Sequence, residues 1–216
     1  MSPDSRERMD GLIRSLEARL SRPKPGLAAQ VRMIPHPRPG HRVYQEVEDT
    51  CHKAGVLLLL YPKGGRPHLV FTLRTEQVDF HKGQISFPGG HQEPDERLDQ
   101  TALREAQEEL GIPPESVRIL GSLTPLYIPP SNTCIYPVVG VTEEPPRFIP
   151  HEPEVAEVLE IPLDHLIHPE SIQRETRTLS GQKLEVPFYH YKGHKIWGAT
   201  AMVLAELLSL LKSART

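Results

Sequence analysis

The sequence is poor in cysteine and aromatic residues. Among 216 residues there are two cysteines, one tryptophan, six tyrosines and five phenylalanines. Cys51 and Cys134 fit no zinc or redox spacing, so we expect two reduced thiols. The net charge of −3 gives no general attraction to nucleic acid or to anionic membranes. Residues 1–22 lack the apolar stretch of a signal peptide, and the apolar run at 196–211 is shorter than a membrane span. We therefore expect a cytoplasmic globular protein that binds neither nucleic acid nor membrane.

The chain length suits one substantial domain with an extension. Residues 3–21 carry apolar side chains at helical spacing, and residues 23–42 are rich in proline. We predict that residues 1–42 are a packing arm without chemistry and that residues 43–216 are the main domain. Further strands are predicted at 56–61, 69–73, 117–123, 135–142, 170–177 and 184–191, and helices at 96–110, 164–167 and 197–212. Strands and helices mix without a strict βαβ rhythm, which favours an α+β or α/β/α arrangement.

The helix predicted at 96–110 is rich in glutamate. Asp95 is its expected N-cap, because a carboxylate suits the positive end of a helix. At about 100° per residue, Glu105, Glu108 and Glu109 share one face beside the apolar stripe. Carboxylates this close repel each other unless a hard divalent cation neutralises them. The spacing alone leaves two readings open, a solvated acidic face and a metal site.

A longer pattern decides between these readings. The chain contains Gly-x5-Glu-x7-Arg-Glu-x-x-Glu-Glu-x-Gly followed by an aliphatic residue. The pattern is filled by Gly90, Glu96, Arg104, Glu105, Glu108, Glu109, Gly111 and Ile112. At ordinary residue frequencies its fixed positions would match by chance about once in 10⁸ starting points. The segment resembles the Nudix box, and the chain is similar to the Nudix hydrolase family over about residues 50–210.

This resemblance implies a fold, a reaction and a metal site. The fold would be a Nudix-type α/β/α sandwich with a mixed sheet, formed by residues 43–216. The reaction would be metal-dependent cleavage of a diphosphate. Glu105, Glu108 and Glu109 would hold Mg²⁺ or Mn²⁺, and the backbone carbonyl of Gly89 would be a further ligand.

The resemblance also implies roles for acids outside the metal set. Glu96 and Arg104 would fix the loop and the helix. In several Nudix relatives a loop acid after the box activates water, and Glu154 is the candidate here. The alternative for Glu154 is an ordinary surface glutamate. Glu108, Glu109 and Glu154 are therefore the expected catalytic residues.

The segment before the box resembles the coenzyme A diphosphatase branch of the family. The signature is roughly Leu-Thr-x-Arg-Ser/Ala-x3-Arg-x3-Gly-x3-Phe-Pro-Gly-Gly. The chain keeps Thr72, Arg74, Gly83, Phe87, Pro88, Gly89 and Gly90. It departs mildly at Thr75, and at Asp79 an acid stands where arginine is expected. A reversed charge beside a phosphate would weaken the assignment to coenzyme A.

Substrate binding is expected from Arg74, His81, Lys82 and Gly83. The cations suit a diphosphate, and the glycine lets backbone approach a ligand closely. The alternatives are a strand-end salt bridge for Arg74 and a plain surface role for His81.

Three functions follow from these observations. The first is cleavage of coenzyme A or acyl-coenzyme A to 4′-phosphopantetheine and adenosine 3′,5′-bisphosphate. Asp79 keeps open a second, the same chemistry on ADP-ribose, nucleotide sugars or dinucleoside polyphosphates. The third is a non-catalytic nucleotide-sensing Nudix domain. The three adjacent, mutually repelling acids argue against it, because a sensor has no need of them. The substrate is a small molecule in each case, and a homodimer is left open.

Overall fold

The computed structural model describes residues 3–37, 50–75, 83–179 and 181–212. Its larger sheet has the strand order β3-β2-β1-β7-β5, and β4, β6 and β8 pair with β1, β7 and β2. The strands of this sheet are β1 (His52–Lys63), β2 (Arg66–Arg74), β3 (Ile85–Ser86), β4 (Gly89–His91), β5 (Arg118–Ser122), β6 (Leu126–Ile128), β7 (Thr133–Val141) and β8 (Val155–Pro162). A smaller sheet contains β9 (Ile172–Leu179), β10 (Gln182–Tyr191) and β11 (His194–Ile196).

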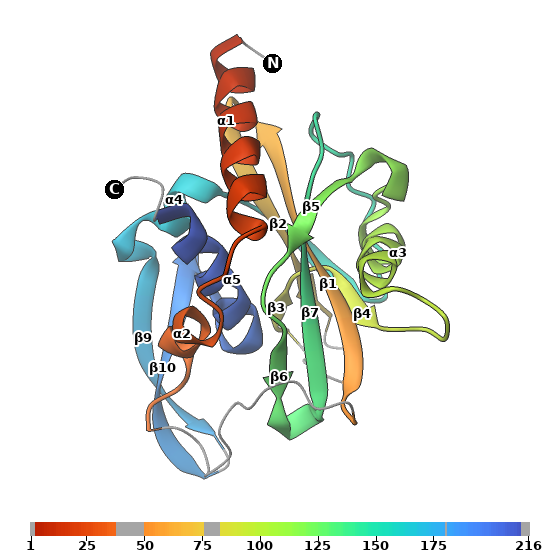
Figure 1. Ribbon diagram of the computed structural model, residues 1–216. Helices are drawn as coiled ribbons and strands as arrows, with labels where there is room; N and C mark the ends of the chain where they lie inside the picture. The colour runs from red at the N-terminus through yellow and green to blue at the C-terminus, as the bar shows by residue number, and fades with distance from the viewer. Residues whose placement is uncertain (1–2, 38–49, 76–82, 180, 213–216) are drawn as a thin grey trace.

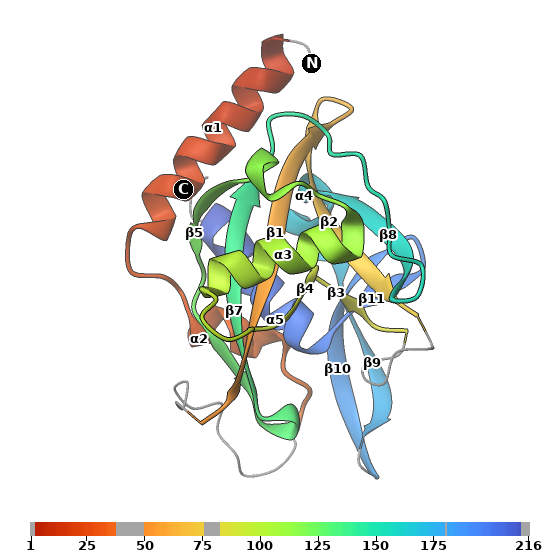
Figure 2. The same cartoon turned by 90° about the vertical axis from the view of Figure 1, so that its right-hand side faces the viewer.

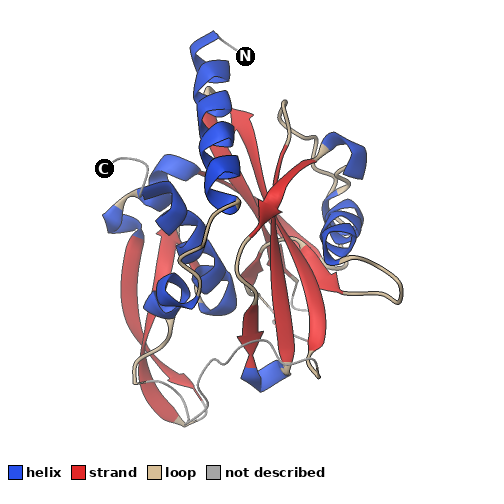
Figure 3. Cartoon of the chain, viewed as in Figure 1, coloured by secondary structure: helices blue, strands red, loops and turns tan. Residues whose placement is uncertain are grey.

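Helices cover both faces of the larger sheet. The helices are α1 (Pro3–Leu20), α2 (Leu27–Gln30), α3 (Leu98–Leu110), α4 (Leu163–Ile167) and α5 (Gly198–Lys212), with short 3-10 turns at Val31–Met33, Pro114–Ser116, Pro129–Ser131 and Pro169–Ser171. Figure 1 shows α3 on one side and α1, α2 and α5 on the other, and the layers are plain in Figure 3. The sheet is mixed, because β1 pairs in parallel with β7 and antiparallel with β2. The predicted α/β/α sandwich is confirmed.

Two apolar cores separate these layers. The α3 side buries Leu57, Leu59, Val70, Ala102, Ala106 and Leu110, among others. The α5 side buries Leu58, Leu60, Phe71, Phe87, Leu204 and Leu207, among others. Alternate residues of β1 and β2 therefore face opposite cores, as the period of two along a strand requires. The near-continuous apolar run in β1 is explained by burial on both faces.

The predicted hairpin of residues 56–73 is confirmed and forms the frame of the site. β1 and β2 pair only near the turn, with Leu60 opposite Leu69. Beyond that point β4 pairs with β1, and β3 pairs with β2. The segment from β3 to β4 therefore fills the gap between the two long strands. These strands of two and three residues were not predicted, because they are too short to show a period.

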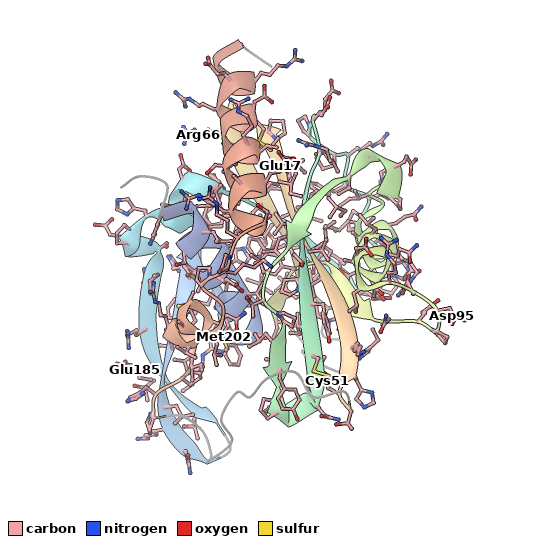
Figure 4. The ribbon with its side chains drawn as sticks, in the orientation of Figure 1. Glu17, Cys51, Arg66, Asp95, Glu185 and Met202 are labelled. Atoms are coloured by element: carbon pink, nitrogen blue, oxygen red, sulfur yellow. A yellow bond between two sulfur atoms is a disulfide. The ribbon has the colours of Figure 1, made fainter. Side chains whose placement is uncertain are left out.

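The glutamate helix begins later than predicted. The N-cap is Arg97, whose backbone N–H donates to the Gln100 side chain at 2.9 Å. The prediction of Asp95 as N-cap is wrong, because Asp95 lies in the preceding turn with a positive φ of 63°. Figure 4 shows Asp95 at the tip of that outward loop. The helix ends as its sequence indicates, since Gly111 adopts the left-handed conformation of a C-terminal cap.

The prediction of two free thiols is wrong. Cys51 and Cys134 form a disulfide with their Cα atoms 5.7 Å apart, visible as a yellow bond at the lower end of β1 in Figure 4. The parallel register of β1 and β7, which places Lys53 opposite Cys134, brings the two residues together. Spacing along the chain does not show this contact, because 83 residues separate the cysteines. The expected cytoplasmic location loses the support that reduced thiols gave it and stays a prediction.

The N-terminal arm packs against the rest of the chain over the part that the structure describes. α1 and the segment through α2 lie against α5, and Met9, Leu16 and Met33 are buried. The fully buried Glu206 of α5 accepts hydrogen bonds from the Gly26 N–H, the Gln30 amide and the Thr124 backbone and hydroxyl. The predicted boundary near residue 42 lies outside the described residues. No helix in the described ranges is long and apolar enough to span a membrane.

Candidate active site

The three box glutamates lie on α3, which crosses the strands of the larger sheet over β1 and β7 (Figure 2). Their exposures differ strongly: the exposed side-chain fraction is 3% for Glu109, 16% for Glu105 and 59% for Glu108. The helix thus presents a carboxylate at the sheet surface, one at the edge and one near solvent. A uniformly solvated acidic face does not have this gradient.

Glu109 is a buried carboxylate with one cation beside it. Arg74, at the end of β2, places Nη1 3.5 Å from Glu109 Oε1. The second oxygen, Oε2, has no hydrogen-bond partner among the described residues. Burial raises the pKa of Glu109 to about 8, Arg74 opposes the rise, and the charges of Glu105 and Glu154 add to it. A buried carboxylate with a free oxygen is costly unless a proton or a cation reaches it.

Arg104 holds the loop before α3 against the helix. Its guanidinium lies 3.0 Å from Glu96, 2.9 Å from Glu105 and 3.0 Å from Glu108. It also donates to the backbone oxygen of His91 at 3.0 Å. The hydrogen bond from Arg104 is the main cause that lowers the pKa of Glu96. This geometry agrees with a positioning role for Glu96 and Arg104.

Gly90 makes room for the Glu105 carboxylate. A Cβ atom on Gly90 would lie 2.4 Å from the carboxyl carbon of Glu105, a distance that real Cβ atoms do not reach. Burial raises the pKa of Glu105, and the Arg104 hydrogen bond opposes the rise. A hydrogen bond from the backbone of the adjoining Gly89 lowers the pKa of Glu109. Gly89 and Gly90 of β4 therefore lie directly against two carboxylates of α3.

These groups fit a divalent cation in their chemistry. Hard divalent ions take oxygen ligands, and the unpartnered Glu109 Oε2 is such a ligand. Within the described ranges, however, no three acidic, histidine or cysteine side chains already converge as a metal cage. Glu108 forms an ion pair with Arg104 at 3.0 Å. Metal binding by all three glutamates would therefore require their side chains to rearrange.

Glu154 is brought to the site by the loop after β7. The Thr75 N–H donates to the Glu154 backbone oxygen at 2.9 Å, and the His151 N–H donates to the Glu109 backbone oxygen at 2.9 Å. The Glu154 charge raises the pKa of both Glu105 and Glu109. The loop acid chosen from the sequence thus lies close enough to the box glutamates to act on their charge, while its own carboxylate lies 3.4 Å from His151 Nδ1. Its catalytic role stays a prediction.

The remaining predicted substrate residues fall in two groups. Gly83 lies in a turn with φ 61°, and the neighbouring Gln84 backbone oxygen accepts from the Arg74 N–H at 3.0 Å. His81, Lys82 and the mismatched Asp79 lie outside the described residues. The structure therefore places Arg74 and the glycine turn at the site.

One contact under the site was missed from the sequence. The Thr200 hydroxyl, in the first turn of α5, donates to the Ile85 backbone oxygen in β3 at 3.0 Å. It ties the start of the box loop to a helix 115 residues away. No spacing in the sequence links these two residues, because they lie in separate segments of the chain.

Comparison with known proteins identifies the family of this chain. The model of the NUDIX domain family matches residues 52–180. The chain belongs to the Nudix hydrolase family. It is 37% identical to Nudix hydrolase NudL of Pectobacterium atrosepticum over 82% of this chain and 88% of that protein. Because it belongs to this family and has diphosphatases among its relatives, the protein is a hydrolase that acts on diphosphate bonds.

Two further relatives carry a named activity. The peroxisomal coenzyme A diphosphatase NUDT7 of Mus musculus is 35% identical, over 75% of this chain and 71% of that protein. The mitochondrial coenzyme A diphosphatase NUDT8 of Homo sapiens is 36% identical, over 73% and 69%. A crystal structure of RenU, a Nudix hydrolase from M. smegmatis, aligns with a TM-score of 0.47 at 24% identity, covering 60% of this chain and 87% of that one.

The buried carboxyl of Glu109 should make the metal-free Nudix hydrolase less stable at high pH. Its pKa is about 8 in the folded chain, against an ordinary value of 4.5. Because the folded state holds this proton more tightly, the stabilising contribution is full below pH 4.5 and is lost as the pH rises toward 8. Glu109→Gln has no such proton to lose. In EDTA, a rise in pH from about 5 to about 9 should lower the melting temperature of wild type by about 5–10 °C more than that of Glu109→Gln. Equal decreases in both proteins would show that Glu109 does not titrate in this range.

Proposed function

We propose that this Nudix hydrolase cleaves the diphosphate of coenzyme A or acyl-coenzyme A with Mg²⁺ or Mn²⁺. The observation that carries the proposal is the contact of Arg74 with Glu109. Arg74 belongs to the coenzyme A signature and Glu109 to the Nudix box. The contact therefore joins a residue expected to bind the anionic diphosphate to a residue expected to bind the metal cation. The coenzyme A diphosphatases among the relatives support the same substrate.

The metal site of the proposal is built from the box. Glu105, Glu108 and Glu109, with the Gly89 carbonyl, would hold the divalent ion. The ion would neutralise the diphosphate charge and lower the pKa of a bound water. Glu109 must give up its proton to serve as a ligand, and Arg74 beside it favours the ionised carboxylate. Glu108 and Glu109 contribute to catalysis by holding negative charge at the reacting centre.

The proton and the phosphates are handled by other residues. Glu154 is the proposed general base, since its charge acts on Glu105 and Glu109 and a carboxylate can accept the proton of the attacking water. The water oxygen bonds to one phosphorus as the bridging P–O bond breaks. Arg74 would bind the diphosphate beside the Gly83 turn, and His81 and Lys82 are proposed to add positive charge. The products from coenzyme A are 4′-phosphopantetheine and adenosine 3′,5′-bisphosphate.

Parallel product analysis tests this substrate assignment. The protein is incubated with Mg²⁺ or Mn²⁺ and, separately, with coenzyme A, ADP-ribose and NADH, and products are identified by mass spectrometry. We expect adenosine 3′,5′-bisphosphate and 4′-phosphopantetheine from coenzyme A at the highest kcat/KM. Turnover of ADP-ribose or NADH with no release from coenzyme A would overturn the coenzyme A assignment and leave the diphosphatase chemistry standing.

A further inference from the structure

The contact of Arg74 with Glu109 is only half satisfied. The Nη1 to Oε1 distance of 3.5 Å is at the long limit for a hydrogen bond. Arg74 Nε and Glu109 Oε2 are both buried without a hydrogen-bond partner among the described residues. A buried donor and a buried acceptor thus remain unpaired in two side chains that contact each other, although each costs free energy while unpaired. The donor suits an anion and the acceptor suits a cation.

The surrounding charges leave Arg74 as the cation that faces Glu109. Arg104, the other arginine of this region, is engaged by Glu96, Glu105 and Glu108. The charges of Glu105 and Glu154 add to that of Glu109. Acids therefore outnumber cations around Glu109 in the described part of the site, which favours an additional positive ion. That ion would lie close to the Arg74 guanidinium, and the two would repel each other.

We propose that Arg74 is a partner-switching counter-ion: it neutralises Glu109 before metal binds and passes to the substrate diphosphate when the metal takes Glu109. This inference rests on the proposed function. It assigns Arg74 two opposite effects. Without substrate, its charge weakens metal binding. With a diphosphate present, Arg74 is occupied by the phosphates, so metal and diphosphate should strengthen each other's binding.

Removing Arg74 should therefore tighten metal binding. A proton can also occupy Glu109, and loss of Arg74 favours the proton too. A divalent ion carries twice the charge of a proton, so relief of the repulsion favours the metal more. For Arg74→Gln we expect Mn²⁺ affinity in the absence of substrate to rise at least about fivefold, the lower end of typical coupling between sites.

Calorimetric titration of Mn²⁺ into metal-free protein measures this effect. The matched control is Arg66→Gln, which removes the same charge from the same strand. Arg66 is exposed and paired with Asp164, about 26 Å along β2 from Arg74. Its Mn²⁺ affinity should stay within about twofold of wild type, because exposed charges at this distance are screened. Arg74→Gln with unchanged or weaker Mn²⁺ binding would overturn the inference.

A second titration tests the transfer to phosphate. Mn²⁺ binding is measured with and without α,β-methylene-ADP, a diphosphate analogue that resists hydrolysis. The analogue should raise the Mn²⁺ affinity of wild type and of Arg66→Gln. The factor by which it raises the Mn²⁺ affinity of Arg74→Gln should be at least about fivefold smaller. Arg74→Lys, which keeps the charge without the planar fork, should bind Mn²⁺ alone like wild type. If Arg74→Gln fails to fold, Arg74→Lys decides. Weaker coupling between Mn²⁺ and the analogue in Arg74→Lys than in wild type supports the inference, and equal coupling overturns it.

The outcomes separate this inference from the proposed function. Coenzyme A hydrolysis by wild type, with equal Mn²⁺ affinity and equal coupling in Arg74→Gln, overturns the partner switch alone. A wild-type protein that neither binds Mn²⁺ nor hydrolyses coenzyme A overturns both.

Discussion

Glu109→Gln is expected to lower the turnover of the diphosphate substrate about a thousandfold, which corresponds to about 4 kcal/mol of lost transition-state stabilisation. The amide keeps the shape of the side chain but cannot carry the negative charge that a divalent ion needs. The fold should survive, because burial already favours the neutral carboxyl, as its pKa of about 8 indicates. The measurement is kcat with Mg²⁺ or Mn²⁺, together with the melting temperature of each protein.

Glu115→Gln is the matched control for this substitution. It makes the same isosteric change on an exposed acid in the turn that follows α3. Its kcat should equal that of wild type within about twofold, because exposed substitutions away from a site have small effects. Near-normal turnover by Glu109→Gln would refute the assignment of Glu109 to the metal site, whatever the substrate.

Glu206→Ala is expected to lower the free energy of unfolding by about 3 kcal/mol. The carboxylate is fully buried in α5 and accepts hydrogen bonds from Gly26, Gln30 and Thr124. Its removal leaves these donors unpaired and opens a cavity between α5, the N-terminal arm and the segment after β5. Chemical denaturation followed by circular dichroism measures the change.

Lys212→Ala is the control on the same helix, because Lys212 is exposed in its last turn. It should change the free energy of unfolding by less than about 0.5 kcal/mol. A loss below about 1 kcal/mol in Glu206→Ala would mean that water replaces the carboxylate, and that the arm does not depend on it.

The sequence predicts those features that repeat along the chain or lie close together in it. The period of α3 predicted that Glu105, Glu108 and Glu109 share one face beside the apolar stripe. In the structure Glu109 is buried with the apolar residues of α3, whereas Glu108 is exposed. The alternation and turn of the β1–β2 hairpin were equally readable, and the fold class followed from the order of elements. The difference in exposure between Glu108 and Glu109 could not be predicted from the sequence, because it depends on how the helix packs on the sheet.

Contacts between distant segments could not be predicted. The Cys51–Cys134 disulfide depends on the parallel register of β1 and β7. The Arg74–Glu109 contact depends on the packing of α3 over the end of β2. Asp95 was misassigned for a local reason, because the Gln100 side chain accepts from Arg97 and moves the helix start two residues on.

The crystal structure of the protein with Mn²⁺ tests the metal site most directly. Anomalous scattering locates the ion without reference to activity. We predict the strongest anomalous peak between the carboxylates of Glu105 and Glu109, with Glu109 Oε2 bound to the ion. A strongest peak away from α3, with Arg74 still on Glu109, would contradict the assignment of these glutamates to a divalent cation.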